Sequence, residues 1–275
     1  MSEPSWHDKQ YLPSLTLANT GLIVESWKSR AAATCSKLKL VGDISYGRHP
    51  RERMDFYPAH NAHGCVVYIH GGYWHSFSKY ETAWIADGFV GQGLSVALIN
   101  YPLCPEVTIG DIRKSCIDAF VHLFQNVLGS AERAAAVVTG HSAGGYLAAA
   151  HLTEKWETHG LPINPIAGVV ALSGIYDVEP LRNTILNDSL RLDAEQARVL
   201  NLNREELRTR ARLILAVGEA ESAEFHRQAT NLAESWASLS PHLIDLPAAN
   251  HYTIVDDLAS PAGQLNRLAV DMARR

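Results

Sequence analysis

Cysteine is scarce in this 275-residue sequence, and nothing in its distribution suggests disulfide pairs. The four cysteines are scattered at Cys35, Cys65, Cys104 and Cys116, without a Cys-x-x-Cys pair. In a chain of this size, such a distribution is typical of reduced structural thiols rather than of a disulfide framework. We therefore expect four free thiols.

Long hydrophobic runs and clusters of positive charge are also missing. No segment approaches the roughly 20 apolar residues that a membrane-spanning helix needs. Residues 1–9 are polar and lack the basic start and apolar run of a secretory signal. The formal net charge is −5, without a block of lysines or arginines. We expect a cytoplasmic protein that binds neither membranes nor nucleic acids.

Metal-binding patterns are absent although the chain has 13 histidines. It contains no His-Glu-x-x-His motif and no histidine–carboxylate cluster with the spacing of metal ligands. We expect no metal and no other cofactor. A metal-dependent hydrolase is a disfavoured alternative, which loss of activity on chelation would support.

The sequence does contain enough apolar residues, 47% of the chain, to bury a large core. Short apolar runs rich in β-branched residues alternate with helical patterns, which favours a mainly parallel sheet flanked by helices. The expected strands are Lys39–Ser45, Arg53–Tyr57, Cys65–Ile69, Ser95–Asn100, Ala135–Thr139, Gly168–Leu172, Arg212–Val217 and His242–Leu246. The expected helices are Ile109–Val127, Ala143–Glu157, Glu224–Leu239 and Gln264–Ala273. A short connection at 47–51 favours an antiparallel first pair of strands.

Two segments interrupt this alternation. Residues 1–37 read as an N-terminal helical segment, and residues 178–208 as helical turns that could form a small cap insertion. Because ligands bind at the carboxyl edge of open α/β sheets, either segment could fold over a site there. We expect residues 1–275 to form a single domain. Apolar positions in the N-terminal helices could pack on the sheet or support a homodimer.

A Gly-x-Ser-x-Gly motif lies between an expected strand and an expected helix, at Gly140–Gly144. This strand–turn–helix context is typical of a serine nucleophile, because the sharp turn exposes the hydroxyl at a helix N-terminus. An ordinary glycine-containing turn is the alternative. We predict that Ser142 is the nucleophile and that the glycines let strand and helix approach closely.

A second glycine motif, His70-Gly-Gly-Tyr-Trp74, follows an earlier strand. Such a turn can supply backbone N–H groups to an oxyanion hole. We predict that the N–H groups of Gly72, Tyr73 and Ala143 stabilise the developing oxyanion. His70 is interpreted as a structural residue that braces this loop.

The expected order of catalytic residues in this type of fold is serine, acid, histidine. His251 lies in a loop directly after the last strand, whereas the other late histidines fall in a predicted helix or strand, so it is the predicted base. Glu219, Glu221 and Glu224 follow the preceding strand and compete for the role of the acid. We favour Glu221, which is nearest the middle of the loop, and keep Glu219 as the alternative.

Together these motifs resemble the α/β-hydrolase superfamily, and within it the kynurenine formamidase (arylformamidase) branch and its carboxylesterase relatives. The matching stretches are His70-Gly-Gly-Tyr-Trp74, Gly140–Gly144, Leu172-Ser-Gly-Ile-Tyr-Asp177, Ser222–Gln228 and Asn250-His-Tyr252. The family usually has aspartate where Glu221 stands. The resemblance implies an α/β-hydrolase fold with a mostly parallel twisted sheet of about eight strands, and a Ser-His-Glu triad that acts through an acyl-enzyme.

The implied substrate is an aryl formamide of the N-formylkynurenine type. A short-chain carboxylesterase is the close alternative, and a non-catalytic scaffold is a further one. Trp74, Phe77 and Tyr176 could wall an aromatic substrate pocket, although each could equally be part of the core. A formamidase for an amino-acid-like substrate must also bind a carboxylate, and the sequence does not identify that residue.

Overall fold

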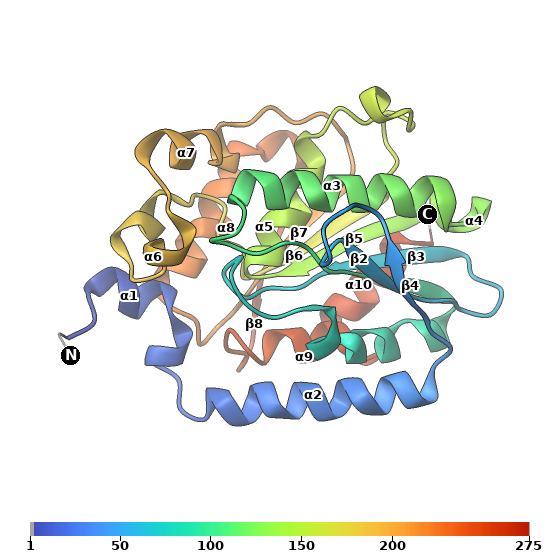
Figure 1. The fold of residues 1–275 in the computed structure, drawn as a ribbon, viewed down its shortest axis with the longest axis horizontal. Helices are drawn as coiled ribbons and strands as arrows, with labels where there is room; N and C mark the ends of the chain where they lie inside the picture. The colour runs from blue at the N-terminus through green and yellow to red at the C-terminus, as the bar shows by residue number, and fades with distance from the viewer. Residues whose placement is uncertain (1–2, 275) are drawn as a thin grey trace.

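The computed structural model describes residues 3–274 and contains one eight-stranded sheet (Figure 1). The spatial order of its strands is β1-β2-β4-β3-β5-β6-β7-β8. Their bounds are β1 Val41–Ser45, β2 Arg53–Tyr57, β3 Gly64–Ile69, β4 Leu94–Ile99, β5 Ala136–His141, β6 Gly168–Leu172, β7 Arg212–Gly218 and β8 His242–Leu246. β2 pairs antiparallel with both β1 and β4, and all other neighbours are parallel. The predicted fold class and the antiparallel first pair are confirmed.

Helices cover both faces of the sheet (Figure 1). Their bounds are α1 Trp6–Tyr11, α2 Thr20–Lys37, α3 Ile109–Asn126, α4 Ser130–Ala134, α5 Ala143–Ala150, α6 Asn187–Leu190, α7 Ala194–Val199, α8 Ala223–Ser235, α9 Ile254–Ala259 and α10 Gln264–Met272. α3, α5 and α8 lie on one face, and α2, α9 and α10 on the other. Every residue of β3, β4, β5 and β6 is buried, as the continuous apolar runs of strands covered on both faces predict.

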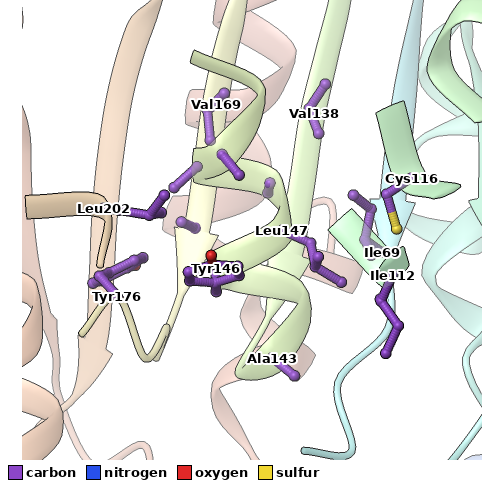
Figure 2. Close-up of a cluster of buried hydrophobic side chains, with 14 of the residues drawn as sticks. Ile69, Ile112, Cys116, Val138, Ala143, Tyr146, Leu147, Val169, Tyr176 and Leu202 are labelled. Carbon is purple, nitrogen blue, oxygen red and sulfur yellow. The ribbon is translucent and has the colours of Figure 1, made fainter. Parts of the chain in front are cut away.

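The core beneath the site is built around α5, the helix that follows the serine motif. Figure 2 shows Tyr146 beside Tyr176 and Leu202, and Leu147 directed toward Ile69 on the other side of the helix. These side chains are all nearly or fully buried. Tyr146 also donates a hydrogen bond of 2.9 Å from its hydroxyl to the carbonyl oxygen of Leu200. Every residue of the helix that starts at the serine motif is buried.

α5 is shorter than its sequence predicts, because it ends at Ala150 and not at Glu157. A 3-10 turn, His151–Thr153, follows it. The carbonyl oxygen of Leu152 accepts a hydrogen bond from the N–H group of Arg208 (2.9 Å), and that of His151 accepts one from the indole of Trp156 (3.2 Å). One distant N–H group and one nearby indole thus occupy carbonyl groups that a longer helix would have used.

The two segments outside the alternation occupy different places. α1 packs against α8 and against the 3-10 turn Glu179–Asn183, and it lies with α6 and α7 at one end of the molecule (Figure 1). α2 instead runs along a face of the sheet, against the 3-10 segments Lys79–Glu81 and Ala83–Gly88. Within the predicted N-terminal helical segment, α1 therefore lies with α6 and α7, the helices of the predicted cap, and α2 does not. Residues 1–2 of this segment lie outside the described part of the chain. None of the helices within residues 3–274 is long and apolar enough to cross a membrane.

Candidate active site

The serine motif forms a strained turn between β5 and α5. Ser142 has φ 56° and ψ −118°, a conformation that non-glycine residues rarely adopt. Its side chain is buried, and its Oγ atom has no hydrogen-bond partner among the described residues. The turn therefore holds a hydroxyl whose hydrogen-bonding capacity is unused.

The turn is possible because strand and helix approach closely at Gly144. A Cβ atom at this position would lie 2.0 Å from the carbonyl oxygen of Ile69 in β3, well inside van der Waals contact. A Cβ atom at Gly140 would lie 2.0 Å from the carbonyl oxygen of Gly144 itself. The close approach predicted from the two glycines is present.

His251 and Glu221 form a buried pair directly beyond β8 and β7. The Nδ1 atom of His251 lies 2.7 Å from Oε2 of Glu221, and both side chains are almost completely shielded from solvent. The other carboxylate oxygen of Glu221 accepts hydrogen bonds from the N–H group of Gly218 (2.7 Å) and the hydroxyl of Ser173 (2.6 Å). Three donors thus hold the carboxylate in a fixed orientation against the imidazole.

The two other candidate acids lie elsewhere. Glu219 is exposed and accepts a hydrogen bond of 3.1 Å from the N–H group of Ala248. Glu224 is part of α8, where it accepts hydrogen bonds from the Tyr11 hydroxyl (2.5 Å) and Arg227 (2.9 Å). Of the three glutamates, only Glu221 contacts the ring of His251.

The histidine inside the serine motif, His141, supports the loop that carries His251. Its Nε2 atom lies 2.7 Å from the carbonyl oxygen of His251, so Nε2 must be the protonated nitrogen that donates. Burial, and then the neighbouring His251, hold the pKa of His141 well below its usual value, so the ring is neutral. This role was not predicted from the sequence, although His141 lies within the serine motif.

The His-Gly-Gly loop lies directly against the serine turn. A Cβ atom at Gly71 would be 3.2 Å from Cβ of Ser142. Gly72 and Tyr73 have positive φ angles, 104° and 50°, and no hydrogen bond within residues 3–274 uses their N–H groups. The N–H group of Ala143 is in the first turn of α5, where it has no acceptor within the helix. Three backbone N–H groups without a partner within residues 3–274 therefore belong to the two segments that lie next to Ser142.

His70 is placed as a structural residue. Its ring stacks on Tyr101, with centroids 4.2 Å apart, and its Nδ1 atom lies 2.7 Å from the carbonyl oxygen of Gly71. Burial lowers the pKa of His70 to about 3, so the ring is neutral at physiological pH. This geometry matches the bracing role that the sequence suggested.

Ser142 and His251 line the same cavity, together with the oxyanion-loop candidates Gly72 and Tyr73. The space inside it that the centre of a water molecule can occupy is about 30 Å³. One water needs roughly 10–15 Å³ of such space, so the cavity has room for about two waters. Its aromatic wall consists of Trp27, Tyr68, Tyr73, Phe77 and Tyr252.

Two of the three predicted pocket residues do not line this cavity. Phe77 does, but Trp74 and Tyr176 are fully buried in the core. The backbone of Trp74 has φ 58°, and its ring packs edge-on against Tyr146, with centroids 5.6 Å apart. Tyr176 packs over Gly174, where an added Cβ atom would meet its ring at 2.4 Å. The expectation that Trp74 and Tyr176 wall the pocket is wrong because packing against neighbouring residues turns both rings into the core.

Trp27 and Tyr252 line the cavity but were not predicted from the sequence. Tyr252 adjoins the predicted base and could have been inferred from that position. Trp27 lies in α2, more than a hundred residues from the serine motif, and no local pattern points to it. Within residues 3–274, no group of three or more His, Cys, Asp or Glu side chains is placed to hold a metal ion, and the four cysteines are unpaired.

This combination of a parallel sheet, a strained serine turn and an adjoining glycine loop is that of an α/β hydrolase. Residues 66–257 match the alpha/beta hydrolase fold family, and the chain belongs to it.

Among individual proteins, the chain is similar to the kynurenine formamidases of Salmo salar and Danio rerio. It is 28% identical to the first over 247 residues, which cover 84% of this chain and 81% of that protein. It is 27% identical to the second over 264 residues, covering 90% and 87%. The resemblance to kynurenine formamidases seen in the motifs therefore extends over most of the chain.

Solved structures of other proteins share the fold of this chain. A suspected thioesterase from Silicibacter sp. TM1040 superposes with a TM-score of 0.88 at 28% identity, covering 96% of this chain and 99% of that one. EstE5, in a crystal soaked with p-nitrophenyl butyrate, superposes with a TM-score of 0.71 at 16% identity, covering 98% of this chain and 95% of that one, and so shows the shared fold alone.

Proposed function

We propose that this protein is a serine hydrolase in which Ser142, His251 and Glu221 form the catalytic triad. The observation that carries the proposal is the buried His251–Glu221 pair beside a cavity that also contains the unpartnered hydroxyl of Ser142. A serine hydroxyl needs a base to take its proton, and a carboxylate on Nδ1 leaves Nε2 of the imidazole free for that task.

In the proposed mechanism, Nε2 of His251 takes the proton of Ser142 as Oγ attacks the acyl carbon of the substrate. Glu221 holds the imidazole in the required tautomer and stabilises the imidazolium that forms. The N–H groups of Gly72, Tyr73 and Ala143 stabilise the tetrahedral oxyanion. His251 then donates its proton to the departing amine or alcohol. In the second half of the reaction, His251 takes a proton from the water that attacks the acyl-enzyme and returns it to Ser142 as the acid product leaves.

We propose an aryl formamide of the N-formylkynurenine type as the substrate class. The similarity to two kynurenine formamidases over most of the chain supports it, and so does a cavity that fits a formyl group. Formyl is the smallest acyl group, and an aniline is a better leaving group than an aliphatic amine.

A short-chain carboxylesterase is the second candidate, and one observation favours it. No lysine or arginine among residues 3–274 lines the cavity, so the carboxylate of an amino-acid-like substrate has no cationic partner from this part of the chain. A higher kcat/KM for phenyl acetate than for N-formylkynurenine would support the esterase, and the reverse preference would support the formamidase.

Replacing Ser142 with alanine tests the nucleophile. We expect Ser142→Ala to lower kcat at least 10⁴-fold for both substrates, because the residual groups cannot form an acyl-enzyme. A fluorophosphonate probe should label the wild-type protein and not the variant. Unchanged turnover in the folded variant would contradict the triad, and a folded wild type that the probe does not label would favour a non-catalytic scaffold. A cytoplasmic location and a homodimer remain predictions from the sequence.

A further inference from the structure

The wall of the cavity includes a residue from outside the segment that matches the hydrolase family. Trp27 is in α2, within the first 37 residues, whereas the family match begins at residue 66. Its side chain is 4% exposed and lines the cavity that contains Ser142 and His251. The N-terminal helical segment therefore supplies part of the site.

Trp27 is held from two sides by other rings. Its ring centroid lies 6.1 Å from that of Phe77 and 6.0 Å from that of Tyr252, the two other aromatic residues at this part of the wall. Trp84 packs behind it at 6.0 Å. The guanidinium of Arg30, one turn further along α2, stacks 3.6 Å above Trp84. The indole of Trp27 is thus packed between the cavity and the ring of Trp84.

Polar contacts fix α2 in this position. Arg30 forms a salt bridge of 2.5 Å with Asp256 of α9. The Thr34 hydroxyl donates a hydrogen bond of 2.5 Å to Asp87, and Lys37 forms a salt bridge of 3.0 Å with the same carboxylate. These contacts do not involve Trp27, whose indole N–H group is buried without a partner among the described residues. A smaller side chain at position 27 would therefore remove ring atoms from the wall while the anchors of the helix remain.

The size of the cavity indicates what this wall does. Room for about two waters fits the carbon atoms of a formyl or acetyl group beside Ser142, and aromatic side chains line the space that a longer acyl chain would need. We infer that Trp27 is a specificity-determining residue that limits the acyl group of the substrate to one or two carbons. This inference rests on the proposed serine hydrolase function and adds the acyl length to it.

The test is a series of p-nitrophenyl esters with acetyl, butyryl and hexanoyl groups. For the wild type, we expect kcat/KM to fall at least tenfold from acetate to butyrate. Trp27→Ala should raise the ratio of butyrate to acetate at least tenfold, and Trp27→Leu, which keeps more of the packing, should raise it less. Thermal unfolding shows whether each variant is folded; if the alanine variant is not, the leucine variant alone decides the question.

Trp6→Ala is the matched control, because Trp6 lies in the same N-terminal segment, is 59% exposed and does not line the cavity. It should leave the butyrate-to-acetate ratio unchanged. An unchanged ratio in folded Trp27 variants overturns the inference. The inference is also overturned if the effect of the Trp27 variants on kcat/KM depends on the alcohol group in a series of acetate esters and not on the length of the acyl chain. A wild type that hydrolyses none of the esters or formamides refutes the proposed function instead, so the two failures are distinguishable.

Discussion

At the scale of single residues, the glutamate in the proposed triad has to fit where the family usually has aspartate. The structure shows how its extra methylene is accommodated. The side chain of Glu221 is completely buried, and one carboxylate oxygen is fixed by Gly218 and Ser173 while the other faces His251. The longer side chain therefore reaches the imidazole without losing its orientation.

Glu221→Gln tests this role of the carboxylate. The glutamine would present an amide NH₂ or a single carbonyl to a site that has three donors, so the imidazole would lose its preferred tautomer. We expect kcat to fall by about 10³–10⁴-fold with the stability changed much less. Glu219→Gln is the control, since Glu219 is exposed and its hydrogen bond to Ala248 can be kept by an amide oxygen. Near-wild-type kcat in folded Glu221→Gln would exclude Glu221 as the acid.

At the scale of elements, the site depends on how closely α5 packs against β3. This approach is set by glycine at position 144, where any Cβ atom would overlap the carbonyl oxygen of Ile69. The other feature of α5, its early end at Ala150, arises from carbonyl groups bonded to Arg208 and Trp156. Local sequence predicts that the helix exists and where it begins, whereas its end also involves the N–H group of Arg208, more than fifty residues further along the chain.

Gly144→Ala tests the approach. We expect the free energy of unfolding to fall by about 3 kcal/mol, because backbone atoms must move to relieve the overlap. The measurement is equilibrium denaturation in urea. Gly91→Ala is the matched control: apart from its own local backbone, no atom of residues 3–274 lies within 4 Å of a Cβ atom there, and its φ is not positive. It should change the stability by no more than about 0.5 kcal/mol. Equal effects of both substitutions would refute the packing argument.

At the scale of the whole molecule, neutral histidines buried in the core make stability depend on pH. Burial lowers the pKa of His70 to about 3 and that of His151 to about 4, below the ordinary value of 6.5. Below pH 6.5 the unfolded chain binds protons that the folded chain does not. The stabilisation is therefore complete above pH 6.5, is lost as the pH falls, and for His151 stops changing below about pH 4.

His151→Gln separates this contribution from other acid effects. Between pH 7.5 and 5.0, we expect His151 to account for a loss of about 2 kcal/mol in the free energy of unfolding. The variant should be less stable at pH 7.5, because the ring packs against Phe120 and Trp156, but its stability should depend less on pH. Urea denaturation at both pH values provides the comparison, with His60→Gln as the exposed control. An unaltered pH dependence in His151→Gln would contradict the prediction.

Three features could be predicted from the sequence: the positions of the strands, their mainly parallel order, and the serine turn. These features depend on local patterns, namely apolar β-branched runs and glycines at Gly140 and Gly144, and the structure contains them. The segments that carry Ser142 and His251 meet because parallel strands bring their carboxyl ends to one edge of the sheet.

Only the tertiary structure decided which side chains surround Ser142. Trp74 ends the His-Gly-Gly-Tyr-Trp motif, yet its ring is buried in the core. Trp27 belongs to an N-terminal helix, yet its ring lines the cavity. The physical reasons differ. The ring of Trp74 is directed by the positive φ angle of its own backbone, whereas the ring of Trp27 is placed by the packing of α2 against Phe77. Such contacts join residues that are distant in sequence, and no local pattern encodes them.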